Sequence, residues 1–412
     1  MRIIYLFQYF ATPEMTGSTF AYETARRLVA RGHEVHVVTS DFSRNDGRWR
    51  TSECEGITIH WCGIRYSNHL SYRRRMVSFF RFAAKSARRA AALGGHVVYA
   101  SSTPLTIALP GVYASRRNAI PMVFEVRDLW PETPIAVGAL RGRMPIAAAR
   151  RLELFAYRNA ARIIARSPDM ARGIVATGYP ADRVTVIPNA CDFALFDVPA
   201  ERGKLFRARH EWLGERPLVV YTGTLGLVNG VSYLARVAAE MASIDPEVRF
   251  LVVGGGREET LVRDTARDLG VLDKNFFMMP PLPKREVPDV LSAADLATST
   301  VIDRRELWAN SANKVFDAMA AGKAFAINHE GWLAELIRRH DCGLVLPAVD
   351  HRAAAVRLAT ALRDREWLQG AARRAKNLGK REFDRDRLVD RLEGVLHAAV
   401  ARSDGARRRR AA

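Results

Sequence analysis

The stretches Arg2-Ile-Ile-Tyr-Leu-Phe-Gln8 and Glu34-Val-His-Val-Val-Thr39 are apolar and rich in residues that favour β-strands. Residues 19–31 lie between them and place Phe20, Leu28 and other apolar side chains at helical spacing. Gly32 follows directly, and a glycine at this place is typical of the end of a helix. A strand, a helix and a second strand of these lengths predict a βαβ unit, which implies a parallel sheet.

The same alternation continues along both halves of the chain. In the first half, further strands are predicted at Val97–Ala100, Met122–Val126, Arg162–Ala165 and Val184–Ile187. The second half restarts the pattern, with strands predicted at Leu218–Thr222, Arg249–Gly254, Asn275–Met279, Leu296–Ser299 and Ala324–Asn328. Helical patterns separate these strands. Two such α/β halves in series predict two doubly wound, Rossmann-like domains that face each other across a cleft.

The expected limits are 1–195 for the first domain and 196–380 for the second. The boundary is expected near residues 192–215, because this stretch contains Pro199, Gly203 and Gly214 amid mixed charge, as a linker would. We expect a helix at 381–403 that packs back toward the first domain. The basic tail at 404–412 is expected to be disordered.

The chain has 412 residues, which suits two domains, and a formal net charge of +19. This charge fits nucleic acid, an anionic membrane face or a polyanionic substrate as partner, and arginine-rich coding in a GC-rich genome would explain it equally well. No apolar run is long enough for a transmembrane helix, and the first residues are interpreted as a strand, not a signal peptide. The four cysteines form no Cys-x-x-Cys pair, which fits a reducing cytoplasm.

Three glycine-containing loops follow predicted strands, at the edge where open α/β sheets bind ligands. The first contains Gly17, Ser18 and Thr19, the second spans Tyr221–Gly230 and the third spans Gly254–Arg257. Glycine lets the backbone approach a ligand, and the N–H groups of a helix start suit a phosphate oxygen. A capped helix or a tight turn without any ligand would produce the same residues.

The segment Trp308-Ala-Asn-Ser-Ala-Asn-Lys-Val-Phe-Asp-Ala-Met-Ala-Ala-Gly322 predicts a helix whose start is polar. Lys314 lies in the first turn, where a cation opposes the helix dipole, so a bound anion would explain its place. Asp317, one turn further, is suited to accept hydrogen bonds from ribose hydroxyls. An exposed lysine on an ordinary helix is the alternative. The polar residues at the helix start are Asn310, Ser311 and Asn313.

Residues 73–89 predict a basic amphipathic helix. Met76, Phe79, Phe80, Ala83 and Ala87 would share one face, and Arg74, Arg81, Lys85 and Arg88 another. Such a helix can lie on an anionic bilayer, where it would present a lipid-linked acceptor to the protein. A helix that packs on its own domain and leaves its basic face in solvent fits the pattern equally well.

The sequence lacks the motifs of several common classes of enzyme. There is no Walker loop, no Gly-x-Ser-x-Gly nucleophile elbow and no His-Glu-x-x-His zinc motif. Asp384 and Asp386 are separated by one residue and flanked by arginines, which indicates a solvated helix face, not a metal site. His33 and His36 are interpreted as structural. We therefore expect neither a metal nor a cofactor.

Taken together and in this order, several motifs resemble those of the family 4 glycosyltransferases, which have the GT-B fold. The resemblance covers nearly the whole chain. Two motifs are similar to those of the WbuB-like subgroup, which is associated with bacterial surface-polysaccharide assembly: Glu125-Val-Arg-Asp-Leu-Trp-Pro131 and Trp308-Ala-Asn-Ser-Ala-Asn-Lys314. The other motifs are Ala25-Arg-Arg-Leu-Val-Ala-Arg-Gly-His-Glu-Val-His36, Val186-Ile-Pro-Asn-Ala-Cys-Asp192, Phe250-Leu-Val-Val-Gly-Gly-Gly256 and Leu291-Ser-Ala-Ala-Asp295.

The resemblance implies a site for a nucleotide-sugar donor. Gly17 would lie against the diphosphate and the transferred sugar. Gly256 and Arg257 would line the nucleotide pocket, and Asp317 would contact the ribose. The other residues expected at the donor are Ser18, Thr19, Gly223, Thr224, Asn229, Pro281, Leu282, Glu306, Asn310, Ser311, Asn313, Lys314, Glu330, Gly331 and Trp332.

Three positions depart from the family pattern. Many relatives carry Arg and Lys where this chain has Thr224 and Asn229, and the first Glu of the family's Glu pair maps to Ala309. Glu306, one turn earlier, is a candidate to replace that Glu. Since a departing nucleotide diphosphate gains negative charge, it needs fixed cations or N–H groups nearby. Lys314, with help from Arg257, is expected to supply the positive charge.

The resemblance also implies that the catalytic residue lies within Arg127-Asp128. Asp128 is the favoured candidate, and Arg127 is the candidate for contact with the acceptor. Members of the family retain anomeric configuration and use no metal.

From these residues we expect a retaining transferase that takes a sugar, such as an N-acetylated or deoxy amino sugar, from a nucleotide diphosphate, with UDP the expected nucleotide. The acceptor would be lipid-linked or a saccharide, in the assembly of a surface polysaccharide such as O-antigen. The protein would lie on the cytoplasmic face of the bacterial plasma membrane. The alternatives are a GT-B sugar-nucleotide epimerase and a non-enzymatic basic binding protein. Nucleic acid is not expected, because no aromatic RNA platform or DNA-reading motif occurs.

Overall fold

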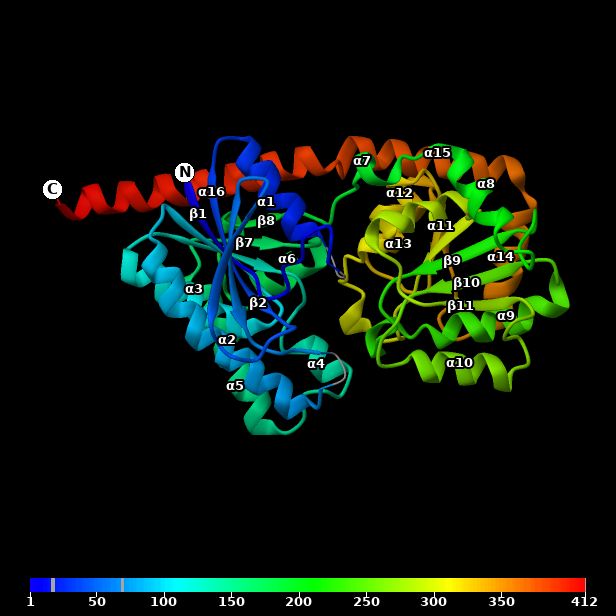
Figure 1. Cartoon of the computed structure of the whole chain (residues 1–412), viewed down its shortest axis with the longest axis horizontal. Coiled ribbons are helices and arrows are strands. Elements are labelled where there is room, and N and C mark those ends of the chain that lie inside the picture. Colours follow the sequence, from blue (N-terminus) through cyan, green and yellow to red (C-terminus); the bar gives the residue numbers. More distant parts are fainter. Residues whose placement is uncertain (16–18, 68–69, 412) are drawn as a thin grey trace. The chain divides into compact units, whose positions relative to one another are not determined.

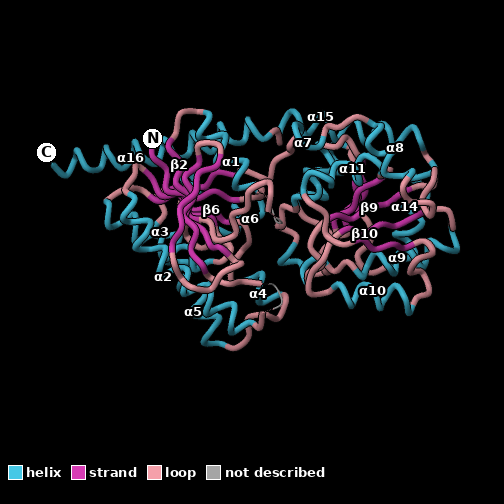
Figure 2. The backbone as a smooth tube through the Cα atoms, in the orientation of Figure 1, coloured by secondary structure: helices cyan, strands magenta, loops and turns pink. Residues whose placement is uncertain are grey.

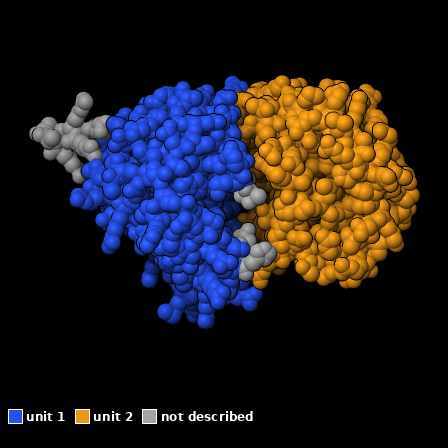
Figure 3. Space-filling model, viewed as in Figure 1, with its two compact units in different colours: residues 1–188, 386–412 blue, residues 189–385 orange. Residues whose placement is uncertain are grey.

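The computed structural model describes residues 1–15, 19–67 and 70–411, which form two compact units. Unit 1 contains residues 1–188 and 386–412, and unit 2 contains residues 189–385 (Figures 1 and 3). The expected limits lay at 195/196 and 380/381. The difference arises because the flanking residues pack into unit 2. Cys191 and Phe383 are both buried in its core, and the N–H of Cys191 donates to the Phe383 carbonyl at 2.8 Å.

The sheet of unit 1 has the strand order β3-β4-β2-β1-β5-β6-β7-β8. Figure 2 draws its strands in magenta, with helices in cyan around them. All neighbouring pairs are parallel except the antiparallel pair β3–β4. The parallel sheet predicted from the first βαβ unit is thereby confirmed. The strands are β1 (Arg2–Leu6), β2 (Glu34–Asp41), β3 (Trp49–Cys54), β4 (Ile57–Gly63), β5 (Val97–Ser101), β6 (Met122–Val126), β7 (Arg162–Ala165) and β8 (Val184–Val186).

The hairpin β3–β4 has no counterpart among the predicted strands. Strand β3 lies at the sheet edge, and its four central residues are exposed. An exposed edge strand does not need the apolar pattern that reveals a buried one, so the sequence of β3 carries little signal.

Helices surround the unit 1 sheet, and α2 packs against α3. In the part of the chain that the structure describes, no helix combines the length and apolar character that crossing a membrane requires. The helices are α1 (Phe20–Ala30), α2 (Tyr72–Leu93), α3 (Ala108–Asn118), α4 (Glu132–Ala136), α5 (Arg143–Asn159), α6 (Pro168–Ala176) and the returning α16 (Arg385–Ala411), with short 3-10 turns η1 (Leu105–Ile107) and η2 (Ala181–Arg183).

The sheet of unit 2 is entirely parallel and has the order β11-β10-β9-β12-β13-β14. Numbered within the unit, this is the order 3-2-1-4-5-6 of a Rossmann sheet. The strands are β9 (Leu218–Thr222), β10 (Arg249–Val253), β11 (Phe276–Met279), β12 (Leu296–Ser299), β13 (Ala324–Ile327) and β14 (Gly343–Val345).

Unit 2 has two apolar cores, one on each face of its sheet. The central strand β9 shows why: Leu218 and Val220 belong to one core, whereas Val219 and Tyr221 belong to the other. Because side chains alternate along a strand, a central parallel strand must be apolar at every position. The helices are α7 (Phe193–Phe196), α8 (Ala200–Ala208), α9 (Ser232–Ile244), α10 (Glu259–Asp268), α11 (Val287–Ala293), α12 (Asn313–Ala320), α13 (Trp332–His340), α14 (His351–Arg363) and α15 (Arg365–Glu382), with η3 (Leu227–Asn229), η4 (Lys284–Glu286) and η5 (Arg305–Leu307).

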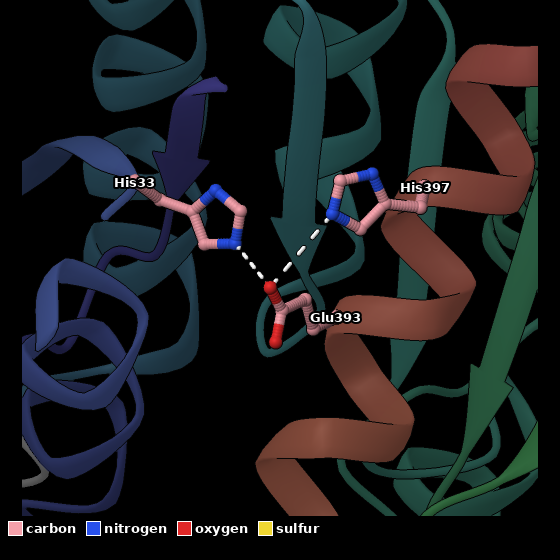
Figure 4. Close-up of side chains that lie close together, drawn as sticks. All are labelled: His33, Glu393 and His397. Carbon is pink, nitrogen blue, oxygen red and sulfur yellow. Dashed lines mark hydrogen bonds and ion pairs between the residues drawn. The ribbon is translucent and has the colours of Figure 1, made fainter. Parts of the chain in front are cut away.

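Helix α16 packs on α1, as expected for a C-terminal helix that returns to the first domain. Arg27 of α1 pairs with Asp386 at 2.7 Å, and the Asp386 side chain is 62% exposed, so this carboxylate lies on the solvated face predicted for it and also binds Arg27. Further along α16, Oε1 of Glu393 lies 2.7 Å from Nε2 of His33 and 3.7 Å from Nε2 of His397 (Figure 4).

Helix α16 continues to Ala411, whereas the predicted helix ended at residue 403 and was followed by a disordered tail. The last residues are mostly Arg and Ala, which are among the best helix formers, so the helix extends through them.

The contact of Arg27 with α16 yields a stability prediction. Arg27 is buried and bonds Glu23 as well as Asp386, so Arg27→Ala should lower the free energy of unfolding by about 2 kcal/mol. Arg26→Ala is the matched control, because Arg26 bonds the same Glu23 from a more exposed position and should cost under about 1 kcal/mol. Urea denaturation measures both. Hydrogen exchange of α16 should accelerate only in Arg27→Ala, and equal exchange in the two variants would contradict the assignment.

Candidate functional site

The strand order of unit 2 places the candidate site at the carboxyl ends of β9 and β12. These two strands are neighbours, and the sheet order reverses between them, which is where doubly wound sheets bind ligands. Gly223 directly follows β9, and α12 follows β12 after an extended loop. The predicted glycine loop and the predicted polar helix start therefore meet at one edge of the sheet.

Lys314, in the first turn of α12, lies against the loop after β9. Its Nζ is 4.9 Å from the centre of the Tyr221 ring, a cation–π distance. A Cβ atom on Gly223 would lie 2.9 Å from Lys314 Cε, so any other residue there would force the end of the lysine side chain to shift. Burial is the main cause that lowers the pKa of Lys314 to about 8; Asp317 opposes the shift, and Lys284 adds a smaller lowering effect. An anion bound here would be attracted strongly, because little water screens the lysine.

Asp317 is buried one turn along α12, and Lys284 donates to its Oδ2 at 2.8 Å. Lys284 was not predicted as a site residue, although it lies three positions after Pro281 in a loop that was. Its Nζ also lies 4.5 Å from the centre of the Phe196 ring. The pair with Asp317 brings a second cation toward Lys314.

The loop after β10 packs directly on the loop after β9. Leu225 donates its N–H to the Gly255 carbonyl at 2.9 Å, and a Cβ on Gly256 would lie 2.5 Å from the Leu225 carbonyl oxygen. Gly256 is therefore required by loop packing as well as by any ligand. Pro281 lies beside this loop, since a Cβ on Gly255 would lie 2.9 Å from Pro281 Cγ. The side chain of Arg257 is exposed.

Two of the three positions that depart from the family pattern, Thr224 and Asn229, lie in the second glycine loop, and Asn229 holds that loop in shape. Asn229 Nδ2 donates to the Thr224 carbonyl at 2.8 Å, and the Tyr221 hydroxyl donates to the same oxygen at 2.8 Å. Asn229 therefore acts on the loop itself, and the Thr224 side chain is exposed.

The residues before α12 have mainly structural contacts. Ser311 is buried, and its carbonyl accepts from the Asn189 side-chain amide. The Asn310 carbonyl accepts from the indole N–H of Trp332 at 2.9 Å. Asn313 is the first residue of α12 and makes no side-chain capping bond. These contacts fix the place of α12, and hence of Lys314.

The remaining predicted donor residues are spread around this edge. Glu330 is paired with Arg338 at 2.6 Å, and Gly331 approaches Trp308 so closely that a Cβ would lie 2.7 Å from its carbonyl oxygen. Glu306 lies exposed in η5, and Leu282 is half-buried in the loop after β11.

In unit 1, Asp128 follows the carboxyl end of β6. Its Oδ2 accepts from the Thr103 hydroxyl at 3.0 Å, and Thr103 follows β5, the neighbouring strand. Thr103 has φ +95, a conformation that a β-branched residue rarely adopts. Such backbone outliers gather at functional sites, so this one supports a role for the Thr103–Asp128 pair.

Arg127 packs into the interior of unit 1. Its guanidinium lies 3.6 Å from the centre of the Phe20 ring and 3.8 Å from the carboxylate of Glu125. Glu125 is fully buried and also pairs with Arg166. Arg127 was expected to contact an acceptor, but its guanidinium is already engaged by Phe20 and Glu125 inside unit 1.

Gly17 and Ser18 lie outside the described residues. Thr19 is buried and occupies the N-cap position of α1, but its side chain makes no capping hydrogen bond. Ser18 or Thr19 was expected to cap the helix, and Thr19 does not do so through its side chain. Its carbonyl instead accepts the N–H of Glu23 at 2.9 Å, the first bond of the helix.

Helix α2 packs on its own domain through a face rotated from the predicted one. Phe79 and Phe82 are buried, whereas Phe80 is 50% exposed. Phe79 therefore does not lie on an exposed face of α2, because core packing determines which side of the helix faces inward. Of the predicted basic face, Arg81 donates to Asn45 at 3.1 Å, and the exposed residues are Arg74, Arg81, Lys85 and Arg88.

Comparison with known families identifies both halves of the chain. Residues 16–190 match the model of the "Glycosyl transferase 4-like domain", and residues 204–381 match "Glycosyl transferases group 1". The chain is a glycosyltransferase. The two parallel α/β units are those of the GT-B fold, so the predicted fold class is confirmed.

Several known proteins are similar to this glycosyltransferase. A D-inositol 3-phosphate glycosyltransferase of Thermomonospora curvata is 28% identical over 93% of this chain and 90% of its own. Anabaena HepE in complex with UDP and glucose has a TM-score of 0.74 at 17% identity, covering 97% of this chain and 100% of HepE. The sucrose-phosphate synthase of Thermosynechococcus elongatus has a TM-score of 0.78 at 15% identity, covering 97% and 99%.

The close approach of Gly223 and Lys314 can be tested without any substrate. Gly223→Ala should push Lys314 toward water, so its pKa should rise from about 8 toward the ordinary 10.5. Gly270→Ala is the control: this residue also has positive φ, but its nearest neighbour, Lys274 Nζ, would lie 4.0 Å from the new Cβ. Both variants should lose about 1–2 kcal/mol of stability. Amine labelling against pH measures the pKa of Lys314, and an unchanged value in Gly223→Ala would contradict the packing.

Proposed function

We propose that the enzyme is a retaining transferase that takes a sugar from a UDP-linked donor held by unit 2. The observation that carries this proposal is the desolvated Lys314 beside two glycine loops at the strand-order reversal. A diphosphate placed there would neutralise Lys314 and meet backbone N–H groups at the start of α12. The HepE structure holds UDP and glucose on the same fold, which supports UDP as the nucleotide.

The geometry of unit 2 supports three donor contacts. Asp317, held by Lys284, would accept hydrogen bonds from the ribose hydroxyls. Pro281, against Gly255, would lie beside the base. Lys284 is close enough to Asp317 to add positive charge near the diphosphate. These two lysines would replace the Arg and Lys that many relatives carry at the positions of Thr224 and Asn229.

In the transfer step, the acceptor oxygen bonds to the anomeric carbon as the bond from that carbon to the phosphate oxygen breaks. The nucleotide diphosphate leaves with nearly one additional negative charge, which Lys314 stabilises. The acceptor attacks the face from which the diphosphate departs, and a phosphate oxygen takes the acceptor's proton. Configuration is thereby retained, without a metal in the step.

Asp128 is the catalytic residue that we assign in unit 1, where the acceptor would bind. Its carboxylate, oriented by Thr103, would accept a hydrogen bond from a substrate hydroxyl and stabilise the positive charge that develops at the anomeric carbon. Arg127 is less suited to substrate contact because its guanidinium packs on Phe20.

We further propose a lipid-linked saccharide as acceptor, in the assembly of a surface polysaccharide on the cytoplasmic face of the plasma membrane. The basic residues of α2 support this setting, since exposed arginines attract anionic headgroups. The donor sugar that we favour is an N-acetylated or deoxy amino sugar, following the resemblance to the WbuB-like subgroup.

The donor assignment predicts a large effect of Lys314→Ala. With UDP-sugars and a lipid diphosphate as acceptor, UDP release should fall on the order of 100-fold, because the leaving group loses its main cation. Lys274→Ala, an exposed lysine of the same unit, is the control and should release UDP at the normal rate. No release by the unchanged enzyme across a broad donor panel would contradict the function, and conversion of the donor alone into an epimer would identify an epimerase.

The same lysine predicts how UDP binding depends on pH. Lys314 loses its proton near pH 8 in the free enzyme, and bound diphosphate would hold that proton to higher pH. Affinity should therefore be full below pH 7 and weaken by about tenfold by pH 9. Calorimetry should show this loss, and Lys314→Ala should bind UDP weakly with no such dependence. A pH-independent Kd in the unchanged enzyme would contradict the role of Lys314.

Asp128→Asn should separate catalysis from donor binding. The amide keeps the shape and the bond to Thr103 but loses the negative charge, so kcat should fall by at least about 100-fold. UDP affinity, which belongs to unit 2, should be unchanged in calorimetry. Asp169→Asn is the control, because this carboxylate pairs with Arg172 on α6. Normal kcat in Asp128→Asn would exclude it as the catalytic residue.

A further inference from the structure

Unit 1 contains a cavity of about 360 Å³ that neither the donor nor the catalytic assignment uses. This volume lies in the range of sites that bind small molecules. We call it the apolar pocket. Its lining residues are Met76, Phe79, Phe80, Pro104, Leu105, Thr106, Trp130, Leu140, Pro145, Ala148, Ala149 and Leu152. Almost every one of these side chains is apolar, and none is charged.

Two helices, α2 and α5, supply most of the lining of the apolar pocket, and both are labelled in Figure 1. On α5, the lining residues have the spacing i, i+3, i+4 and i+7, which places Pro145, Ala148, Ala149 and Leu152 on one helical face. The two alanines have small side chains, so they leave the space of the cavity unfilled. The α2 wall includes Phe80, which is half-exposed although it is aromatic.

The floor of the apolar pocket belongs to the segments that hold Asp128. Pro104 follows Thr103, whose hydroxyl donates to Asp128, and Trp130 lies two residues after Asp128. These segments are the loops at the carboxyl ends of β5 and β6. A ligand in the pocket would therefore end beside the residue assigned to act on the acceptor.

The surroundings of the apolar pocket are basic. Helix α2 contains arginines and a lysine but no acidic residue, and no acidic residue occurs between positions 138 and 152. Arg74 and Arg143 are exposed, one near the start of each wall helix. Met144, beside Arg143, is 85% exposed. Apolar side chains in solvent next to arginines are typical of a surface that meets anionic amphiphiles.

We propose that the apolar pocket binds the hydrocarbon chain of an anionic lipid, and that the lipid's phosphate lies against the arginines at the pocket rim. A free sugar does not fit, because its hydroxyls would lose water and find few partners in this lining. A folded protein partner would need a flat surface of about 1,000 Å² in place of a small cavity. Identifying this lipid as the acceptor rests on the proposed function, but the binding of a chain does not.

The test uses dodecyl phosphate that carries a diazirine at the chain end, below its micelle-forming concentration. After irradiation, mass spectrometry should locate the label in peptides containing residues 76–80, 104–106 or 140–152. Ala149→Trp fills the cavity and should reduce labelling there by at least about tenfold. Ala147→Trp, an exposed position two residues earlier that does not line the pocket, should label like the unchanged protein.

Two further measurements test the chemistry of the ligand. Butyl phosphate and inorganic phosphate should fail to compete with the probe, whereas dodecyl phosphate without the diazirine should compete. Arg74→Gln combined with Arg143→Gln should weaken the probe's binding and leave a neutral dodecyl maltoside probe unaffected. Labelling outside the three peptides, or equal labelling of Ala149→Trp and Ala147→Trp, would overturn the proposal.

Separate control experiments distinguish loss of folding and failure of the proposed function from loss of chain binding. Ala148→Phe offers a second, milder filling of the same space, and calorimetry with UDP reports on unit 2 in every variant. If the probe labels the pocket while no UDP-sugar is consumed, the chain site stands and the proposed transfer fails. If transfer to a water-soluble saccharide proceeds while labelling is absent, the transferase stands and the apolar pocket is not a lipid site.

Discussion

The chemistry of unit 2 depends on one constraint, a lysine held where water cannot fully solvate it. Burial lowers the pKa of Lys314 to about 8, and Asp317, which opposes this shift, is itself bonded by Lys284. A cation in the first turn of a helix is also opposed by the helix dipole. Both effects disfavour Lys314 in the empty protein, and both are offset once an anion occupies the same position. The geometry is therefore that of a site prepared for negative charge.

This constraint explains why the neighbouring loops contain glycines, which leave space for close packing around the lysine. The missing Cβ of Gly223 lets Lys314 keep its position, and Gly256 must lack a Cβ to admit the Leu225 carbonyl. Tyr221 supplies a ring face to the lysine while its hydroxyl bonds the Thr224 carbonyl. Asn229 bonds that carbonyl too. The residues that depart from the family pattern thus support the loop, while the charge comes from α12.

Much of the fold could be predicted from the sequence because the strands of a buried parallel sheet are continuous apolar runs. Met122–Val126, Leu218–Thr222 and Leu296–Ser299 are strands with those bounds. The exposed edge strand β3 lacks such a run and was missed. Lys314 was found because a lysine at a helix start is a local anomaly. The pairing of Lys284 with Asp317 depends on the loop after β11 folding beside α12, which no spacing along the chain reveals.

The rotation of α2 shows a second limit and changes the interpretation of its apolar residues. Periodicity indicates that one face is apolar, but only packing decides whether Phe80 or Phe82 is buried. With Phe82 in the core, Phe80 is left to line a cavity whose other wall, on α5, is also apolar. An apolar residue that a helix does not need for its own packing is costly in water unless something covers it. Under our proposal, the side of α2 that meets a lipid is therefore this pocket, and exposed arginines such as Arg74 would hold the headgroup.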